Sequence, residues 1–159
     1  CRSPGILPGQ VKALQKGSKL SECGCPQCVS ACKNDPGRLV PADLPVLAAH
    51  LDLTVDELIA AYLVKIPLSE KDKVYALAPA KLKGRRFLAD PGTIVPDYYT
   101  SERGTCVFLD DNGLCTVHDF KPFECGAYMG CKNTFLGKPY REKQVEEYFM
   151  QKWRKFRVV

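Results

Sequence analysis

Long apolar runs are missing from this sequence of 159 residues, and so are several motifs that mark common classes of protein. No stretch approaches the roughly 18 apolar residues of a membrane span, and no signal peptide is visible. There is no glycine-rich phosphate loop and no pattern of nucleophile, histidine and acid. We therefore expect a cytoplasmic protein without a membrane span, and no motif names a catalytic residue.

A strong excess of one charge is also missing. The chain has 23 basic and 18 acidic residues, a net charge of +5. Nucleic-acid-binding domains usually show a stronger or more focused basic bias. The most basic run, Lys81-Leu82-Lys83-Gly84-Arg85-Arg86, fits a solvated loop or strand edge better than a patch that contacts phosphates. Nucleic acid is therefore not the partner we expect.

Cysteine is absent from the 73 residues between Cys32 and Cys106, although the chain has nine cysteines. Cys1 is interpreted as an incidental thiol. The other eight form two groups, one on each side of the gap: Cys23, Cys25, Cys28 and Cys32, then Cys106, Cys115, Cys125 and Cys131. A chain of this length can bury about two-thirds of its unfolded surface, so it does not need disulfides to fold.

The spacing of the first group favours metal binding. It reads C-x-C-x2-C-x3-C, with Cys25-Pro26-Gln27-Cys28 at its centre. A C-x-x-C loop can place two thiolates on one ion at about 2.3 Å each. Four sulfurs so close in sequence are too crowded for two ordinary disulfides, which need Cα atoms about 5.5 Å apart. The second group is looser and lacks a C-x-x-C, so we expect a metal to join residues 23–32 to residues 106–131.

Other interpretations of these cysteines stay open. Their even number would also suit a disulfide framework in an oxidising compartment. C-x-x-C occurs in thioredoxin-like redox sites too, although there it follows a strand and opens a helix, whereas here we expect a loop rich in glycine and proline. Counting does not separate zinc, which takes four thiolates, from a 4Fe–4S cluster, which also takes four cysteines, nor one site from two. His118 is a further candidate ligand, less favoured than a hydrogen-bonding or surface role, and His50 is a weaker one.

Two helices are expected in the first half of the chain. Residues 23–38 are predicted to be loops with one helical turn near Val29–Cys32, followed by a helix that starts at Pro41-Ala42-Asp43. Thr54-Val55-Asp56-Glu57 is a capping box for a second helix, which Pro67 should end. A helix–turn–helix that binds DNA is disfavoured, because Asp56 and Glu57 would meet phosphates.

Strands and a last helix complete the prediction. Val74–Ala78 and Arg86–Leu88 should be strands, and residues 105–109 and 114–118 a hairpin around an Asn-Gly turn. Residues 141–156 should form an amphipathic helix whose stripe is Val145, Phe149, Trp153 and Phe156. The fold class is α+β: a small single domain over residues 23–159, preceded by an arm at 1–22, with helices around a short hairpin-containing sheet and a cysteine-bound metal as a staple.

Several segments resemble a known family. They are Cys25-Pro26-Gln27-Cys28-Val29-Ser30-Ala31-Cys32, Pro41-Ala42-Asp43, Cys106-Val107-Phe108-Leu109-Asp110, and Cys115-Thr116-Val117-His118-Asp119-Phe120-Lys121-Pro122-Phe123-Glu124-Cys125. Over residues 23–131 the chain resembles the YkgJ-type cysteine-cluster family, which is described as a zinc- or iron-chelating domain and includes flagellin lysine methylases. The family commonly has Arg-Pro where this chain has Lys121-Pro122.

The expected function is therefore that of a metal-binding cysteine-cluster protein, which holds zinc or an iron–sulfur cluster through the eight grouped cysteines. Its downstream role is not given by the sequence, and a protein partner is left open. Two alternatives are an iron–sulfur oxidoreductase or methyl transferase, and a zinc-knuckle adaptor that contacts nucleic acid through Lys81–Arg86.

Overall fold

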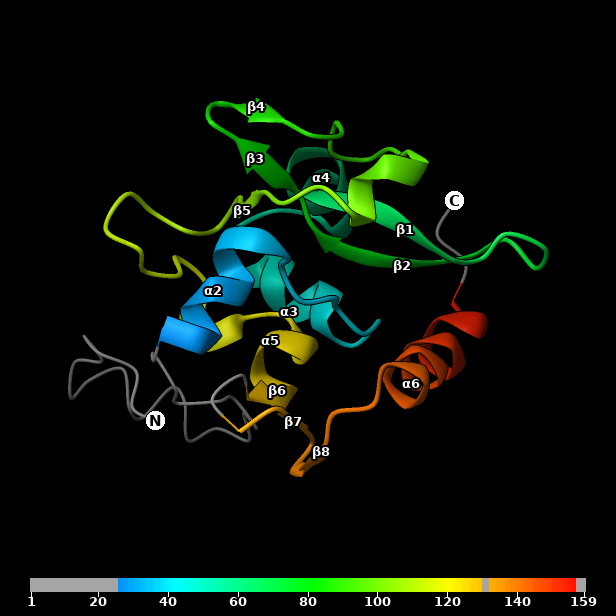
Figure 1. Cartoon of the computed structure of the whole chain (residues 1–159). Coiled ribbons are helices and arrows are strands. Elements are labelled where there is room, and N and C mark those ends of the chain that lie inside the picture. The colour runs from blue at the N-terminus through cyan, green and yellow to red at the C-terminus, as the bar shows by residue number, and fades with distance from the viewer. Residues whose placement is uncertain (1–25, 130–131, 157–159) are drawn as a thin grey trace.

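The computed structural model describes residues 26–129 and 132–156, which form a small α+β domain (Figure 1). The arm predicted at 1–22 lies outside the described residues. The described α-helices are α2 (Pro26–Asn34), α3 (Asp43–His50), α4 (Val55–Tyr62), α5 (Phe123–Ala127) and α6 (Glu142–Arg154), with 3-10 turns η1 (Asp97–Thr100) and η2 (His118–Phe120). The strands are β1 (Leu63–Ser69), β2 (Val74–Pro79), β3 (Lys81–Lys83), β4 (Arg86–Phe87), β5 (Thr105–Cys106), β6 (Tyr128–Met129), β7 (Thr134–Phe135) and β8 (Lys138–Pro139).

The strands form three small antiparallel sheets, in the orders β1-β2, β4-β3-β5 and β6-β7-β8. The β1–β2 hairpin is the longest, and its register pairs Leu63 with Pro79 and Lys65 with Leu77. Ala76, Leu77 and Ala78 are all buried, because α6 and other segments cover the hairpin (Figure 1). None of the described helices is long and apolar enough to cross a membrane.

The predicted helices α3 and α4 are confirmed. The Thr54 hydroxyl accepts a hydrogen bond from Glu57 N at 3.1 Å and donates one to Glu57 Oε1 at 3.0 Å. The expected end of α4 was wrong: the helix stops at Tyr62, and Pro67 lies inside β1. Pro67 has no backbone N–H to donate to the neighbouring strand. It is tolerated there because the register shifts between Pro67 and Ser69, and at a bulge not every backbone N–H is paired.

Two other local predictions need correction. Residues 26–34 form a full helix rather than loops with a single turn, because Pro26 suits a first helical position and the next glycine or proline comes only at Pro36. The hairpin near residue 112 keeps its turn but not its long strands. Leu109 and Cys115 form one isolated bridge, while β5 pairs with β3 instead.

The amphipathic C-terminal helix is confirmed as a packing element. Val145, Phe149 and Trp153 are buried on α6, whereas Lys152, Arg154 and Lys155 are exposed. Phe156 lies beyond the helix and is 38% exposed, so the buried stripe ends at Trp153, three residues before its expected end. In Figure 1, α6 lies beneath the β1–β2 hairpin, where it closes one side of the core.

Candidate metal centre

Four of the eight grouped cysteines have described side chains, and each comes from a different segment. Cys32 lies on α2, Cys106 ends β5, Cys115 follows the turn at residues 110–113, and Cys125 lies on α5. Cys106 is buried and the other three are half-buried, and none of the four is in a disulfide. The first cysteine group is thus represented here by Cys32 and the second by the other three.

These thiols lie close enough to influence one another. Burial is the main cause that raises the pKa of Cys115 to about 11, and the nearby Cys32 thiol adds to the shift. Burial likewise raises the pKa of Cys106 and of Cys125 well above the usual range, and the other three cysteines contribute at Cys125. All three thiols are therefore neutral near pH 7, and a cation would be needed to hold them as thiolates.

The turn before Cys115 explains why Cys106 and Cys115 are neighbours. Asp110 Oδ1 accepts hydrogen bonds from the backbone N–H groups of Asn112 at 2.9 Å and Leu114 at 2.8 Å. Gly113 adopts φ +77°, which only glycine takes without strain. The chain reverses at this point, so that Cys115 returns alongside Leu109.

Glycine also permits the close approach at Cys125. A Cβ atom on Gly37 would lie 2.7 Å from Cys125 N and 2.8 Å from Cys125 Sγ. Distances this short do not occur for real Cβ atoms, so any larger residue would displace Cys125 or its own backbone. Gly37 follows α2, and it therefore brings the segment that carries Cys32 against the segment that carries Cys125.

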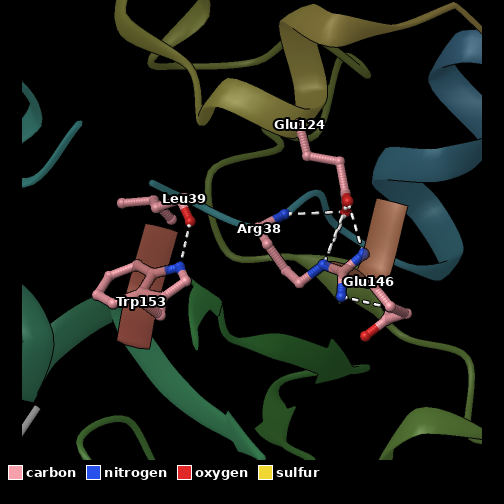
Figure 2. Close-up of polar contacts among 5 residues, drawn as sticks. All are labelled: Arg38, Leu39, Glu124, Glu146 and Trp153. Atoms are coloured by element: carbon pink, nitrogen blue, oxygen red, sulfur yellow. Dashed lines mark hydrogen bonds and ion pairs between the residues drawn. The ribbon is translucent and has the colours of Figure 1, made fainter. Parts of the chain in front are cut away.

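A half-buried ion pair lies beside this contact. Figure 2 shows the Arg38 guanidinium between Glu124 and Glu146, with Nη2 2.8 Å from Glu124 Oε2 and Nη1 2.6 Å from Glu146 Oε1. Burial alone would lower the pKa of Arg38, but the two carboxylates raise it above its usual value. Burial raises the pKa of Glu124, and Arg38 opposes that shift. The sequence prediction missed Arg38 and Glu124 as residues of the site. The only available signal was that Glu124 directly precedes Cys125.

The remaining predicted ligands are less well defined. Cys23, Cys25 and Cys131 lie outside the described residues, and the side chain of Cys28 does too, although its backbone belongs to α2. The argument that C-x-x-C lies wholly in a loop was therefore wrong, and the redox-dithiol alternative keeps its place. His118 is half-buried, and burial together with Lys121 lowers its pKa. His50 is exposed and stacks on Phe120 at 4.4 Å between ring centroids.

The basic side chains of the run Lys81–Arg86 differ in their exposure to solvent. Lys83, Arg85 and Arg86 are exposed, as expected for a strand edge, but Lys81 is only 2% exposed. Lys81 Nζ donates to the carbonyl oxygens of Tyr99 and Glu102, each at 3.1 Å. Lys81 is therefore a structural residue and is not available to contact a phosphate.

An open cleft of about 390 Å³ lies between the end of α2 and residues 100–103, and Tyr128 also lines it. Its two carboxylates already have lysine partners: Asp35 lies 3.0 Å from Lys81 Nζ, and Glu102 lies 3.6 Å from Lys83 Nζ. The cleft therefore does not offer a free carboxylate to a ligand.

Four cysteines from converging segments fit zinc or an iron–sulfur cluster in their chemistry, since both take thiolate ligands. Within residues 26–129 and 132–156, however, no three Cys, His, Asp or Glu side chains are arranged to hold a metal ion as they stand. Half of the predicted ligand set lies outside the described side chains. A comparison with family models, curated proteins and solved structures finds no match to this chain.

Proposed function

We propose that the protein binds zinc or an iron–sulfur cluster through cysteines of both sequence groups, as a cytoplasmic cysteine-cluster protein of the kind its resemblance to the YkgJ-type family implies. One observation carries the proposal. Cys32, from the first group, lies within electrostatic range of Cys106, Cys115 and Cys125, from the second. The two groups are separated by 73 residues in sequence.

The electrostatics of the thiols favour metal binding over a disulfide framework or a reactive dithiol. A disulfide framework would join cysteines in pairs, whereas Cys125 is affected by three others at once. Thiols whose pKa is raised by burial are poor nucleophiles, which argues against a reactive dithiol at these positions. A divalent metal or a cluster would displace their protons and balance the charge of the thiolates.

The chain's own residues would supply ligands and exclude water. Cys106 belongs to the hydrophobic core, and Cys32 and Cys115 pack against it. A group bound there would connect α2 to the segments that follow β5. Helix α2 already contacts β5 itself. Structural metal sites contribute folding free energy in this way.

The test is metal analysis of the full chain, purified anaerobically without a histidine tag. We expect stoichiometric zinc in a colourless protein, or iron and sulfide with absorption near 400 nm. Cys32→Ser and Cys125→Ser should each lower the metal content, while Cys1→Ser should leave it unchanged. Metal-free wild type that binds neither Zn²⁺ nor Co²⁺, and that cannot be reconstituted with iron and sulfide, would refute the proposal.

A further inference from the structure

Helix α5, which carries Cys125, is too short to be stable by itself. It has five residues, and its N-cap residue, Pro122, makes no side-chain capping bond. An isolated helix of this length does not form in water, because nucleation costs more than its few hydrogen bonds return. The position of Cys125 must therefore be fixed by contacts from outside α5.

Those contacts come from the segment after α2. Glu124 N donates to Arg38 O at 3.1 Å, and Phe123 N donates to Asp43 Oδ2 at 2.8 Å. These two N–H groups belong to the first turn of α5 and have no partner within the helix. Residues 38–43 thus act in place of a cap.

The contact at Arg38 is reciprocal. Arg38 N donates to Glu124 Oε1 at 3.1 Å, while its Nε and Nη2 donate to Glu124 Oε2 at 3.2 and 2.8 Å. Backbone and side chain of one residue therefore bind backbone and side chain of the other. Arg38 itself is anchored further, since its guanidinium lies 4.3 Å above the ring of Phe149.

Net stability is a weak reason for such a pair. Burying two charges costs about as much as their attraction returns, and well-packed apolar residues often serve equally well. In some proteins, a buried pair with defined hydrogen bonds instead specifies one register between two segments. Here the register concerns Gly37 and Cys125, whose contact permits no side chain on Gly37.

We propose that Arg38 and Glu124 are positioning residues for the cysteine centre: together they hold Cys125 against Gly37, so that its thiol faces those of Cys32, Cys106 and Cys115. This inference rests on the proposed function, because it assigns a role to residues that support the same site. Neither residue is a ligand in this proposal.

The test uses Glu124→Ala in the full chain, with Glu124→Gln as the conservative variant and Glu146→Ala as the matched control. Glu146 is the other carboxylate on Arg38, but it lies on α6 and does not lead to Cys125. Metal-free protein is titrated with Co²⁺, whose thiolate charge-transfer absorption reports binding, and Zn²⁺ is then added in competition. We expect Glu124→Ala to weaken Co²⁺ binding roughly 10- to 100-fold, as is typical for residues that orient ligands. Glu124→Gln should weaken it less, and Glu146→Ala by less than about threefold, since a half-exposed ion pair contributes little.

A second measurement does not depend on metal. The alkylation rates of Cys125 and Cys106 by N-ethylmaleimide are compared within the same metal-free molecules by peptide mass spectrometry. If Glu124 positions Cys125, then Glu124→Ala should raise the rate at Cys125 and leave Cys106 unchanged. A residue that only stabilises the fold would raise both rates together.

The outcomes distinguish the positioning role of Arg38 and Glu124 from the proposed metal binding. Wild type that binds Co²⁺ while Glu124→Ala binds it equally well overturns the positioning role and leaves the proposed function intact. Equal acceleration at both cysteines also overturns it. Wild type that binds neither Co²⁺ nor Zn²⁺ and takes up no cluster refutes the proposed function, and the positioning role fails with it.

Discussion

The indole nitrogen of Trp153 donates a hydrogen bond to the carbonyl oxygen of Leu39 at 2.9 Å, and both residues are fully buried (Figure 2). The bond joins the last helix to the loop that follows α2. Leu39 N in turn donates to Leu77 O at 2.8 Å. The residue next to Arg38 is therefore fixed to both α6 and β2, which gives the Arg38 segment a rigid support.

The first prediction concerns this bond. Trp153→Phe removes the donor and leaves the buried Leu39 carbonyl without it, so the free energy of unfolding should fall by about 1–3 kcal/mol. Urea unfolding followed by circular dichroism measures the change, because the variant lacks the only tryptophan. Gln151→Ala, at an exposed position of α6, is the control and should change little. Equal stability of the two variants would contradict the prediction.

The second prediction concerns Lys81. Lys81→Met keeps the length of the side chain but leaves the carbonyls of Tyr99 and Glu102 without their donor, so it should cost about 1–3 kcal/mol. Asp35→Asn removes only the ion pair, whose carboxylate is 75% exposed, and should cost less than about 1 kcal/mol. Thermal and urea unfolding of both variants would check this. A larger loss for Asp35→Asn would mean that the ion pair, not the carbonyl contacts, holds Lys81.

Local signals in the sequence predicted much of the fold. The capping box at Thr54 and the stripe of Val145, Phe149 and Trp153 each depend on residues within one or two turns of helix. Such patterns are readable because the partners lie three or four residues apart. The errors came where distant segments decide. Leu63 and Val64 fit the apolar face of a helix equally well, but pairing with Pro79 and Ala78 makes them a strand.

The sequence also predicts one part of the candidate site and not another. The cysteines and their two groups can be read from the sequence, and this grouping predicts that the groups converge. The residues that hold Cys125 cannot be read from it, because Arg38 and Glu124 lie 86 residues apart and their contact follows no periodic pattern. The contact of Gly37 with Cys125 is similarly distant in sequence. The prediction that Cys25 and Cys28 share one centre with the second group stays a prediction, since their side chains lie outside the described residues.

The third prediction is a pH dependence at His118. Burial, followed by the charge of Lys121, lowers its pKa below the ordinary value of about 6.5. As the pH falls, the unfolded chain therefore takes up this proton first, so metal-free protein should lose stability below about pH 6.5. Proton NMR of the imidazole should give a midpoint below that of the urea-unfolded chain, and His118→Gln should flatten the stability profile between pH 7.5 and 5.5. A midpoint at or above the unfolded value would refute the shift, and an imidazole that stops titrating when Zn²⁺ is added would make His118 a ligand.

The fourth prediction is that metal contributes to folding. Complete chelation, or Cys28→Ser, should lower the stability by several kcal/mol, because ligand binding to the native state alone stabilises it. Segment 23–38 should then become sensitive to protease, while the apolar core around β1 and β2 retains partial structure. Thermal melting with and without chelator, followed by limited proteolysis, provides the measurement. An unchanged melting temperature after all metal is removed would contradict it.

The fifth prediction tests the contact between Gly37 and Cys125. Gly37→Ala places a methyl group 2.7 Å from Cys125 N and 2.8 Å from its Sγ, so either α5 or the Arg38 segment must move. Overpacking of this kind costs about 1–3 kcal/mol, and we expect weaker Co²⁺ binding in addition, because Cys125 is displaced. Gly92→Ala is the control: Gly92 has φ +83°, so alanine there is strained by about 1–2 kcal/mol, but its nearest neighbour is Ala60 on α4. If stability alone governed binding, both variants would lose Co²⁺ affinity in proportion to their loss of stability. If the contact sets the position of the thiol, Gly37→Ala should lose much more affinity than Gly92→Ala at equal stability, and Co²⁺ titration of both variants decides between the two.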